Sequence, residues 1–89
     1  MKKGEVITVT CLAGEVIGKL DNFDGNEVTL TDPRVVTPGP DNRVGIAKGI
    51  SYSGKLNPTS VTIKGYIFAQ ETHPDFEREY IKAVTGLVV

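Results

Sequence analysis

The sequence contains no tryptophan, one cysteine and one histidine, and the scarcity of the last two limits the functions that the chain can have. The lone Cys11 cannot form a disulfide within the chain, which is typical of proteins in a reducing compartment. Because His73 is the single histidine, the chain has no pair of imidazoles for a metal ion, and we expect neither a metal site nor a cofactor. No nucleophile is accompanied by a base and an orienting group, so we predict a protein that is not an enzyme.

Long apolar runs are also missing. No stretch approaches the roughly 18 residues that a membrane-spanning helix requires. The basic start Met1–Lys3 is followed by Gly4 and Glu5 rather than by an apolar segment, so it lacks the pattern of a secretion signal. We therefore expect a soluble, intracellular, cytoplasmic protein that does not associate with membranes.

Neither sign of charge dominates. The 10 Lys and Arg residues and 11 Asp and Glu residues give a formal net charge of −1. This balance argues against a general nucleic-acid coat, which needs many phosphate contacts, but it allows a localised basic site. The 89 residues are predicted to form one domain over 1–89, whose modest core would benefit from self-association.

What the sequence does contain is the period-two alternation of β-strands, clearest over residues 14–32. The alternation continues on both sides of Asp24-Gly25-Asn26, residues that tolerate the positive φ angles of a tight turn. The same pattern predicts five strands, at about 5–12, 15–23, 26–36, 43–53 and 60–70. We therefore expect an all-β fold in which these strands form a small antiparallel barrel.

One helix is expected at the end of the chain, over about 74–85. Thr72 is a suitable N-cap, Pro74 fits the first helical position, and Gly86 is a natural stop. An apolar stripe runs along this helix, formed by Phe76, Tyr80 and Val84 and widened by Ile81 and Ala83.

The stretch around the predicted turn resembles the first motif of the Sm and Sm-like (LSm) family, at Gly18, Leu20, Phe23, Asp24, Asn26, Val28 and Leu30. Ile63-Lys64-Gly65 resembles the second motif, and Ala47-Lys48-Gly49 is a weaker alternative. The resemblance implies a strongly bent, five-stranded open barrel, SH3-like in shape, whose subunits join edge to edge in a ring. It also implies that single-stranded RNA binds at the inner rim. The implied RNA-binding residues are Phe23, Asp24, Asn26, Lys64 and Gly65, with Lys48 and Gly49 as the alternative to the last two.

The chain departs from the family pattern, so the resemblance implies a divergent member, of a kind expected among phage or bacterial proteins. Asn26 follows Asp24 more closely than in the family, and the helix stands at the C-terminal rather than the N-terminal end. The motif residues also have simpler interpretations. Asp, Gly and Asn favour hairpin turns for backbone reasons alone, Phe23 can be a core residue at the hairpin end, and Lys64-Gly65 can be a solvated Lys beside a bending Gly.

Tyr66 and Phe68 alternate with the aliphatic residues of the fifth predicted strand. We expect either the helix stripe or a neighbouring subunit to cover them, with the helix favoured. The leading hypothesis is a non-catalytic Sm-like protein that forms a homo-oligomeric ring and binds single-stranded RNA. The alternative is a structural or adaptor module, for instance of a phage, that assembles through its barrel edges without binding nucleic acid.

Overall fold

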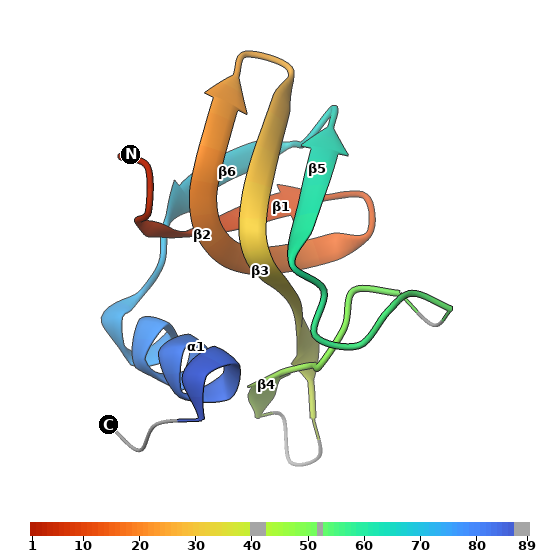
Figure 1. The fold of residues 1–89 in the computed structure, drawn as a ribbon, viewed down its shortest axis with the longest axis vertical. Helices are drawn as coiled ribbons and strands as arrows, with labels where there is room; N and C mark the ends of the chain where they lie inside the picture. Colours follow the sequence, from red (N-terminus) through yellow and green to blue (C-terminus); the bar gives the residue numbers. More distant parts are fainter. Residues whose placement is uncertain (40–42, 52, 87–89) are drawn as a thin grey trace.

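Six strands followed by one helix make up the structure, a computed structural model that describes residues 1–39, 43–51 and 53–86 (Figure 1). The elements are β1 (Val6–Cys11), β2 (Gly14–Asp24), β3 (Glu27–Pro38), β4 (Val44–Ile46), β5 (Ser60–Lys64), β6 (Phe68–Glu71) and α1 (Pro74–Thr85). All the strand pairs are antiparallel. The predicted class, a small all-β barrel with one C-terminal helix, is confirmed.

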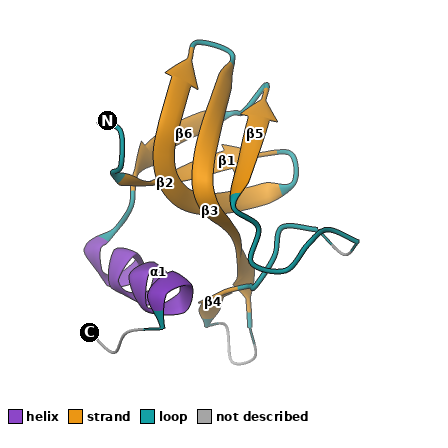
Figure 2. Cartoon of the chain, in the orientation of Figure 1, coloured by secondary structure: helices purple, strands orange, loops and turns teal. Residues whose placement is uncertain are grey.

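The sheet curls into a barrel that stays open (Figure 2). Its hydrogen-bonded order is β4-β3-β2-β1-β6, and β5 also pairs with β3. The 12 residues of β3 are enough to pair with β5 near Glu27 and with β4 near Pro38. In the described residues β5 and β6 each have a strand partner on one side only, so both are edge strands.

The strand β3 contains a β-bulge at Asp32 and Pro33. The pairing jumps from Thr31 opposite Lys19 to Arg34 opposite Ile17, and Asp32 adopts a φ of 51°. Proline is tolerated in a strand at such a bulge because no ladder N–H is needed there, and the bulge bends the strand. Because β3 bends here, its first half can pair with β5 and its last residues with β4.

The two faces of the sheet bury separate apolar clusters. The cluster inside the barrel consists of Ile7, Val9, Val16, Leu20, Val28 and Leu30. Outside the barrel, Tyr80 of α1 packs on Val6 and Ile17. The rest of the helix contact consists of Phe76, Ile81 and Val84, whereas Ala83 of the predicted stripe is exposed.

The helix has the predicted bounds but a different N-cap. The His73 imidazole, not Thr72, caps the helix, because its Nδ1 accepts a hydrogen bond from the Asp75 N–H at 3.1 Å. The Thr72 hydroxyl instead lies 3.0 Å from the Thr8 hydroxyl of β1. The Thr72 hydroxyl therefore bonds to the sheet instead of capping the helix. Gly86 ends the helix in the left-handed conformation, with a φ of 73°, as its position predicted.

The fourth predicted strand, 43–53, is wrong in extent, since β4 ends at Ile46. The Ala47 N–H still donates to the Val35 carbonyl at 2.9 Å, and the Gly49 carbonyl accepts from the Val35 N–H at a long 3.4 Å, after which the chain leaves β3 and forms a loop. Residue 52 of the predicted strand lies outside the described residues. Small residues at 45, 47 and 49 give this segment few side chains to hold it on a sheet.

The fifth predicted strand, 60–70, is two strands. Gly65 has a φ of 64°, and the break there sends β5 to β3 and β6 to β1. The break also shifts the alternation, so that Tyr66 packs against the inner cluster while Ile67 is 60% exposed. A strand pattern read straight through Gly65 assigns these two side chains to the wrong faces.

The expectation that the helix covers Tyr66 and Phe68 is also wrong. The helix packs on Val6 and Ile17, and Phe68 is 48% exposed at the start of the edge strand β6. The helix therefore leaves this edge open.

Candidate functional site

The β2–β3 turn and the β5–β6 junction lie side by side. The Gly65 N–H donates to the Asn26 carbonyl at 2.9 Å, and Lys64 is the ladder partner of Glu27. The left-handed Gly65 makes the approach possible by turning the chain directly after β5. The fold thus gathers the predicted site residues, which are far apart in sequence: Phe23, Asp24, Asn26, Lys64 and Gly65.

Phe23 presents a partly open aromatic ring at this place. Its side chain is 47% exposed, so it is neither a buried core residue nor fully solvated. The Tyr66 ring lies behind it, with 6.0 Å between the ring centroids and an angle of 54° between the planes. The Tyr66 hydroxyl points to the Gly25 carbonyl at a long 3.5 Å. A flat ligand ring could stack on Phe23, an interaction that contributes about 1–3 kcal/mol per base in single-strand binding.

Carboxylates outnumber ammonium groups around the turn. Asp24 is exposed, and the Lys64 ammonium lies 4.0 Å from the Glu27 carboxylate. The Asp21 carboxylate of β2 lies 3.7 Å from the ammonium of Lys3, which precedes β1. Exposed ion pairs of this kind are weak, so the Lys64 side chain could move to contact a ligand. The Glu27 carboxylate nevertheless balances its charge. The turn thus combines an exposed amide residue, Asn26, with a partly exposed aromatic ring, and its charges are nearly balanced.

The weaker motif alternative, Lys48 and Gly49, is not part of this site. Both residues lie in the loop that follows β4, at the lower right of Figure 1, whereas the β2–β3 turn is at the top. They line a groove of about 420 Å³ together with aliphatic residues, among them Val35 and Leu56. The structure therefore separates the two Lys-Gly pairs: Lys64-Gly65 lies at the β2–β3 turn, and the weaker alternative lies in another part of the fold.

A buried guanidinium anchors this loop. Arg34 is 4% exposed, and its guanidinium donates to the carbonyls of Pro33 and Pro58 at 2.7 and 3.3 Å. It also donates to the Asn57 side-chain oxygen at 3.3 Å. These partners are neutral, so Arg34 fixes the end of the loop while it keeps its full positive charge.

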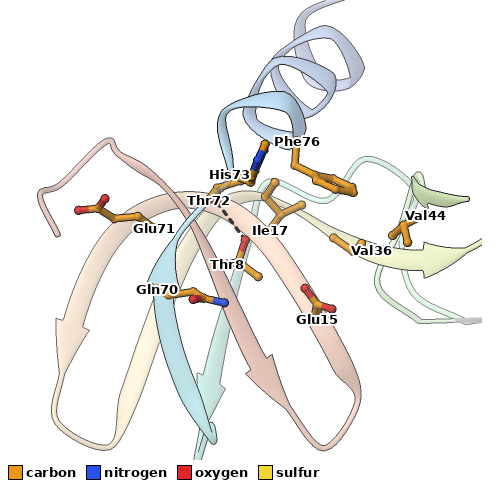
Figure 3. A pocket seen from close by; sticks show the side chains of 10 residues that line it. All are labelled: Thr8, Glu15, Ile17, Val36, Val44, Gln70, Glu71, Thr72, His73 and Phe76. Carbon is orange, nitrogen blue, oxygen red and sulfur yellow. Dashed lines mark hydrogen bonds between the residues drawn. The ribbon is translucent and has the colours of Figure 1, made fainter.

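Sequence reasoning missed a cavity of about 520 Å³ on the outer face of the sheet, beside the start of α1 (Figure 3). Its apolar end is formed by Ile17, Val36, Val44 and Phe76. Figure 3 shows Gln70 and the Thr8–Thr72 hydrogen bond on the other side of Ile17, whereas Glu15 lies beside its ladder partner Val36. No sequence motif marks this cavity, because its lining residues come from five strands and the helix. It contains none of the predicted site residues.

Two further features bear on function within the ranges 1–39, 43–51 and 53–86. No helix there is long and apolar enough to cross a bilayer. Nor does that part of the chain group three or more His, Cys, Asp or Glu side chains in a way that could hold a metal ion.

Comparison with models of known protein families and with curated proteins finds no match for this chain.

Proposed function

We propose that this chain is a non-catalytic Sm-like protein that assembles edge to edge into a cyclic homo-oligomer. The observation that carries the proposal is the open barrel, in which β5 and β6 are edge strands of a single subunit. An unpaired edge is a template for another strand, so pairing β5 of one copy with β6 of the next would satisfy both. Contacts between two different surfaces generate a ring when the rotation closes.

The exposed apolar side chains at β6 support this proposal. Ile67 is 60% and Phe68 48% exposed, and they stand at the start of the edge strand β6, beside the edge that a neighbouring strand would pair with. Burying them against a second copy would contribute up to about 1.5–3 kcal/mol per side chain.

The test of assembly is the mass in solution. Light scattering should give a multiple of the 9.6 kDa subunit. Phe68→Glu should reduce this mass and leave the circular dichroism spectrum unchanged, because the side chain is exposed in the subunit. Leu56→Glu is the matched control, since Leu56 is 63% exposed on the loop after β4, and it should leave the mass unchanged. A monomeric parent protein would rule out the ring.

The second part of the proposal is that the ring binds single-stranded RNA at the turn site. The partly exposed Phe23 ring and the Asn26 amide support it, because both stand at the same turn and can contact one base. The ladder places Lys64 on the face of Asp24 and Glu27, opposite Phe23, so its ammonium would contact a different part of the strand. One such contact is weak, but a ring repeats it in every subunit along one strand.

Fluorescence anisotropy with labelled oligo-uridine and oligo-adenosine tests this part. Asn26→Ala should weaken binding while the mass of the oligomer stays the same. If the parent assembles and binds neither strand at low salt, the RNA role is wrong. The adaptor function then takes its place, which the surplus of carboxylates around the turn would favour.

A further inference from the structure

Positive charge is concentrated in one segment of the chain. Residues 33–59 contain four basic residues and one acidic residue, whereas the rest of the chain contains six basic and ten acidic residues. This segment covers the end of β3, β4 and the loop that leaves the barrel at the lower right of Figure 1. A nearly neutral chain therefore carries a basic region at some distance from the turn site.

The loop in this segment is held at its base. The Asn57 N–H donates to the Lys48 carbonyl at 2.7 Å, which closes the loop, and Arg34 holds Asn57 and Pro58 from below. Lys48 lies where the chain enters the loop, and Lys55 lies where it returns. The backbone at the base of the loop is thus fixed by hydrogen bonds and by a buried side chain, and both lysines extend from this one loop.

The cations of this region are available to a ligand. Arg43, Lys48 and Lys55 are exposed, and none of them takes part in the ion pairs formed among the described residues. This contrasts with the turn site, where Glu27 balances Lys64. The buried Arg34 adds a further positive charge with neutral partners only.

Beside these cations the groove offers an apolar wall. Of the residues that line its 420 Å³, Lys48 is the one with a charge, and the polar remainder consists of hydroxyls and backbone. Leu56, 63% exposed, and Ile50 form part of the aliphatic wall. A ligand that alternates negative groups with flat apolar ones would match this surface.

We propose that this basic loop, defined by Lys48, Lys55 and Leu56, binds the phosphate backbone of single-stranded nucleic acid, with a base against the aliphatic wall. A single strand has the required alternation of phosphates and bases. The loop is separate from the turn site and does not depend on base reading by Asn26. Its role is sequence-independent attraction, which the turn site lacks the charge to provide.

The salt dependence of binding measures this role. Each phosphate neutralised by a lysine or arginine contributes about 0.7 to the slope of log affinity against log salt for single strands. The double variant Lys48→Gln/Lys55→Gln should therefore lower the slope by about 1.4 for each bound subunit. Between about 50 and 200 mM salt, the parent should then lose about sevenfold more affinity than the variant.

The matched control is Lys2→Gln/Lys82→Gln, which removes the same charge from exposed positions outside the basic loop. Anisotropy with a short mixed-sequence oligonucleotide should show the parent slope for this control and the reduced slope for the loop variant. Asn26→Ala should weaken binding without changing the slope, which separates the loop from the turn site. Circular dichroism and light scattering verify that fold and mass are unchanged.

Four results would overturn the inference. One is a loop variant that keeps the parent slope. Another is a parent that binds no single strand at low salt. A third is displacement of the oligonucleotide by polyglutamate of equal charge, which would make an acidic protein segment the partner. The last is a loop variant that changes the mass of the oligomer but not binding, which would make a second copy of the chain the occupant.

Discussion

Replacing Tyr80 with phenylalanine should remove one buried hydroxyl and little else. Tyr80 is 0% exposed, and its hydroxyl donates to the carbonyls of Asp32 and Thr31 at 2.8 and 3.2 Å. Both carbonyls belong to the bulge of β3, where the ladder to β2 is interrupted. Without the hydroxyl they lose a donor in a buried place, which costs about 1–3 kcal/mol in the free energy of unfolding.

The same hydroxyl gives this prediction a pH dependence. Burial first, and then the negative charge of Asp32, raise the pKa of Tyr80 from 10.0 to about 12, although Arg34 acts in the opposite direction. The folded state thus keeps the proton at a pH where the unfolded chain loses it. Stability from this group is complete below pH 10 and is lost as the pH rises toward 12, by up to about 2–3 kcal/mol.

Tyr80→Phe has no such proton, so the advantage of the parent should shrink with rising pH. At neutral pH the parent should be more stable by about 1–3 kcal/mol, and this difference should approach zero in the alkaline range. Urea unfolding followed by circular dichroism at several pH values measures the difference directly. All other side chains are common to the two proteins, so their contributions cancel in the comparison.

Tyr66→Phe is the control for this experiment. The Tyr66 hydroxyl reaches an acceptor only at 3.5 Å, so its removal should change stability little and leave the alkaline loss intact. The reasoning is wrong if Tyr80→Phe is as stable as the parent at neutral pH. It is also wrong if the variant loses as much stability as the parent between pH 10 and 12.

Two further substitutions test the β3 bulge and the loop anchor. Gly18→Ala would place a Cβ 3.0 Å from the Leu30 Cβ, and overpacking of this kind should lower the free energy of unfolding by about 1–3 kcal/mol in a thermal melt. Gly25→Ala, with nothing within 4 Å of the added Cβ, should have a much smaller effect, and equal effects would refute the steric cause. Asn57→Ala removes an acceptor of buried Arg34 and places alanine at a φ of 52°, so it should cost about 1–3 kcal/mol in urea unfolding. Asn57→Asp restores the acceptor, and a variant no more stable than Asn57→Ala would show that the Arg34 contact contributes nothing.

The strands and the helix were predictable where the signal is local. Alternation around Val16 and Val28 predicted the β2–β3 hairpin, and Pro74 and Gly86 predicted both ends of the helix. Prediction failed where a distant group decides the outcome. Thr72 was expected to cap the helix, but its hydroxyl contacts β1 and His73 takes that role.

The candidate site shows the same division. The sequence named both segments of the turn site through a family resemblance, but their contact depends on the fold, which brings Gly65 to Asn26. The orientation of Tyr66 followed from the left-handed Gly65, and a regular strand pattern placed its ring on the wrong face. The basic residues of the loop can be counted in the sequence. Only the structure shows that Lys64 forms an ion pair while Lys48 forms none among the described residues.

By itself the sequence determined the first three strands, the turns between them and where the helix begins and ends, because alternation, turn residues and helix-terminal residues act over a few neighbouring positions. Only the tertiary structure decided which strands are left as edges, which face the helix covers and which charges stay unpaired. Those outcomes depend on groups far apart in the chain, such as Arg34 with Asn57 and Tyr80 with Asp32, whose interaction energies exist only once the barrel has formed.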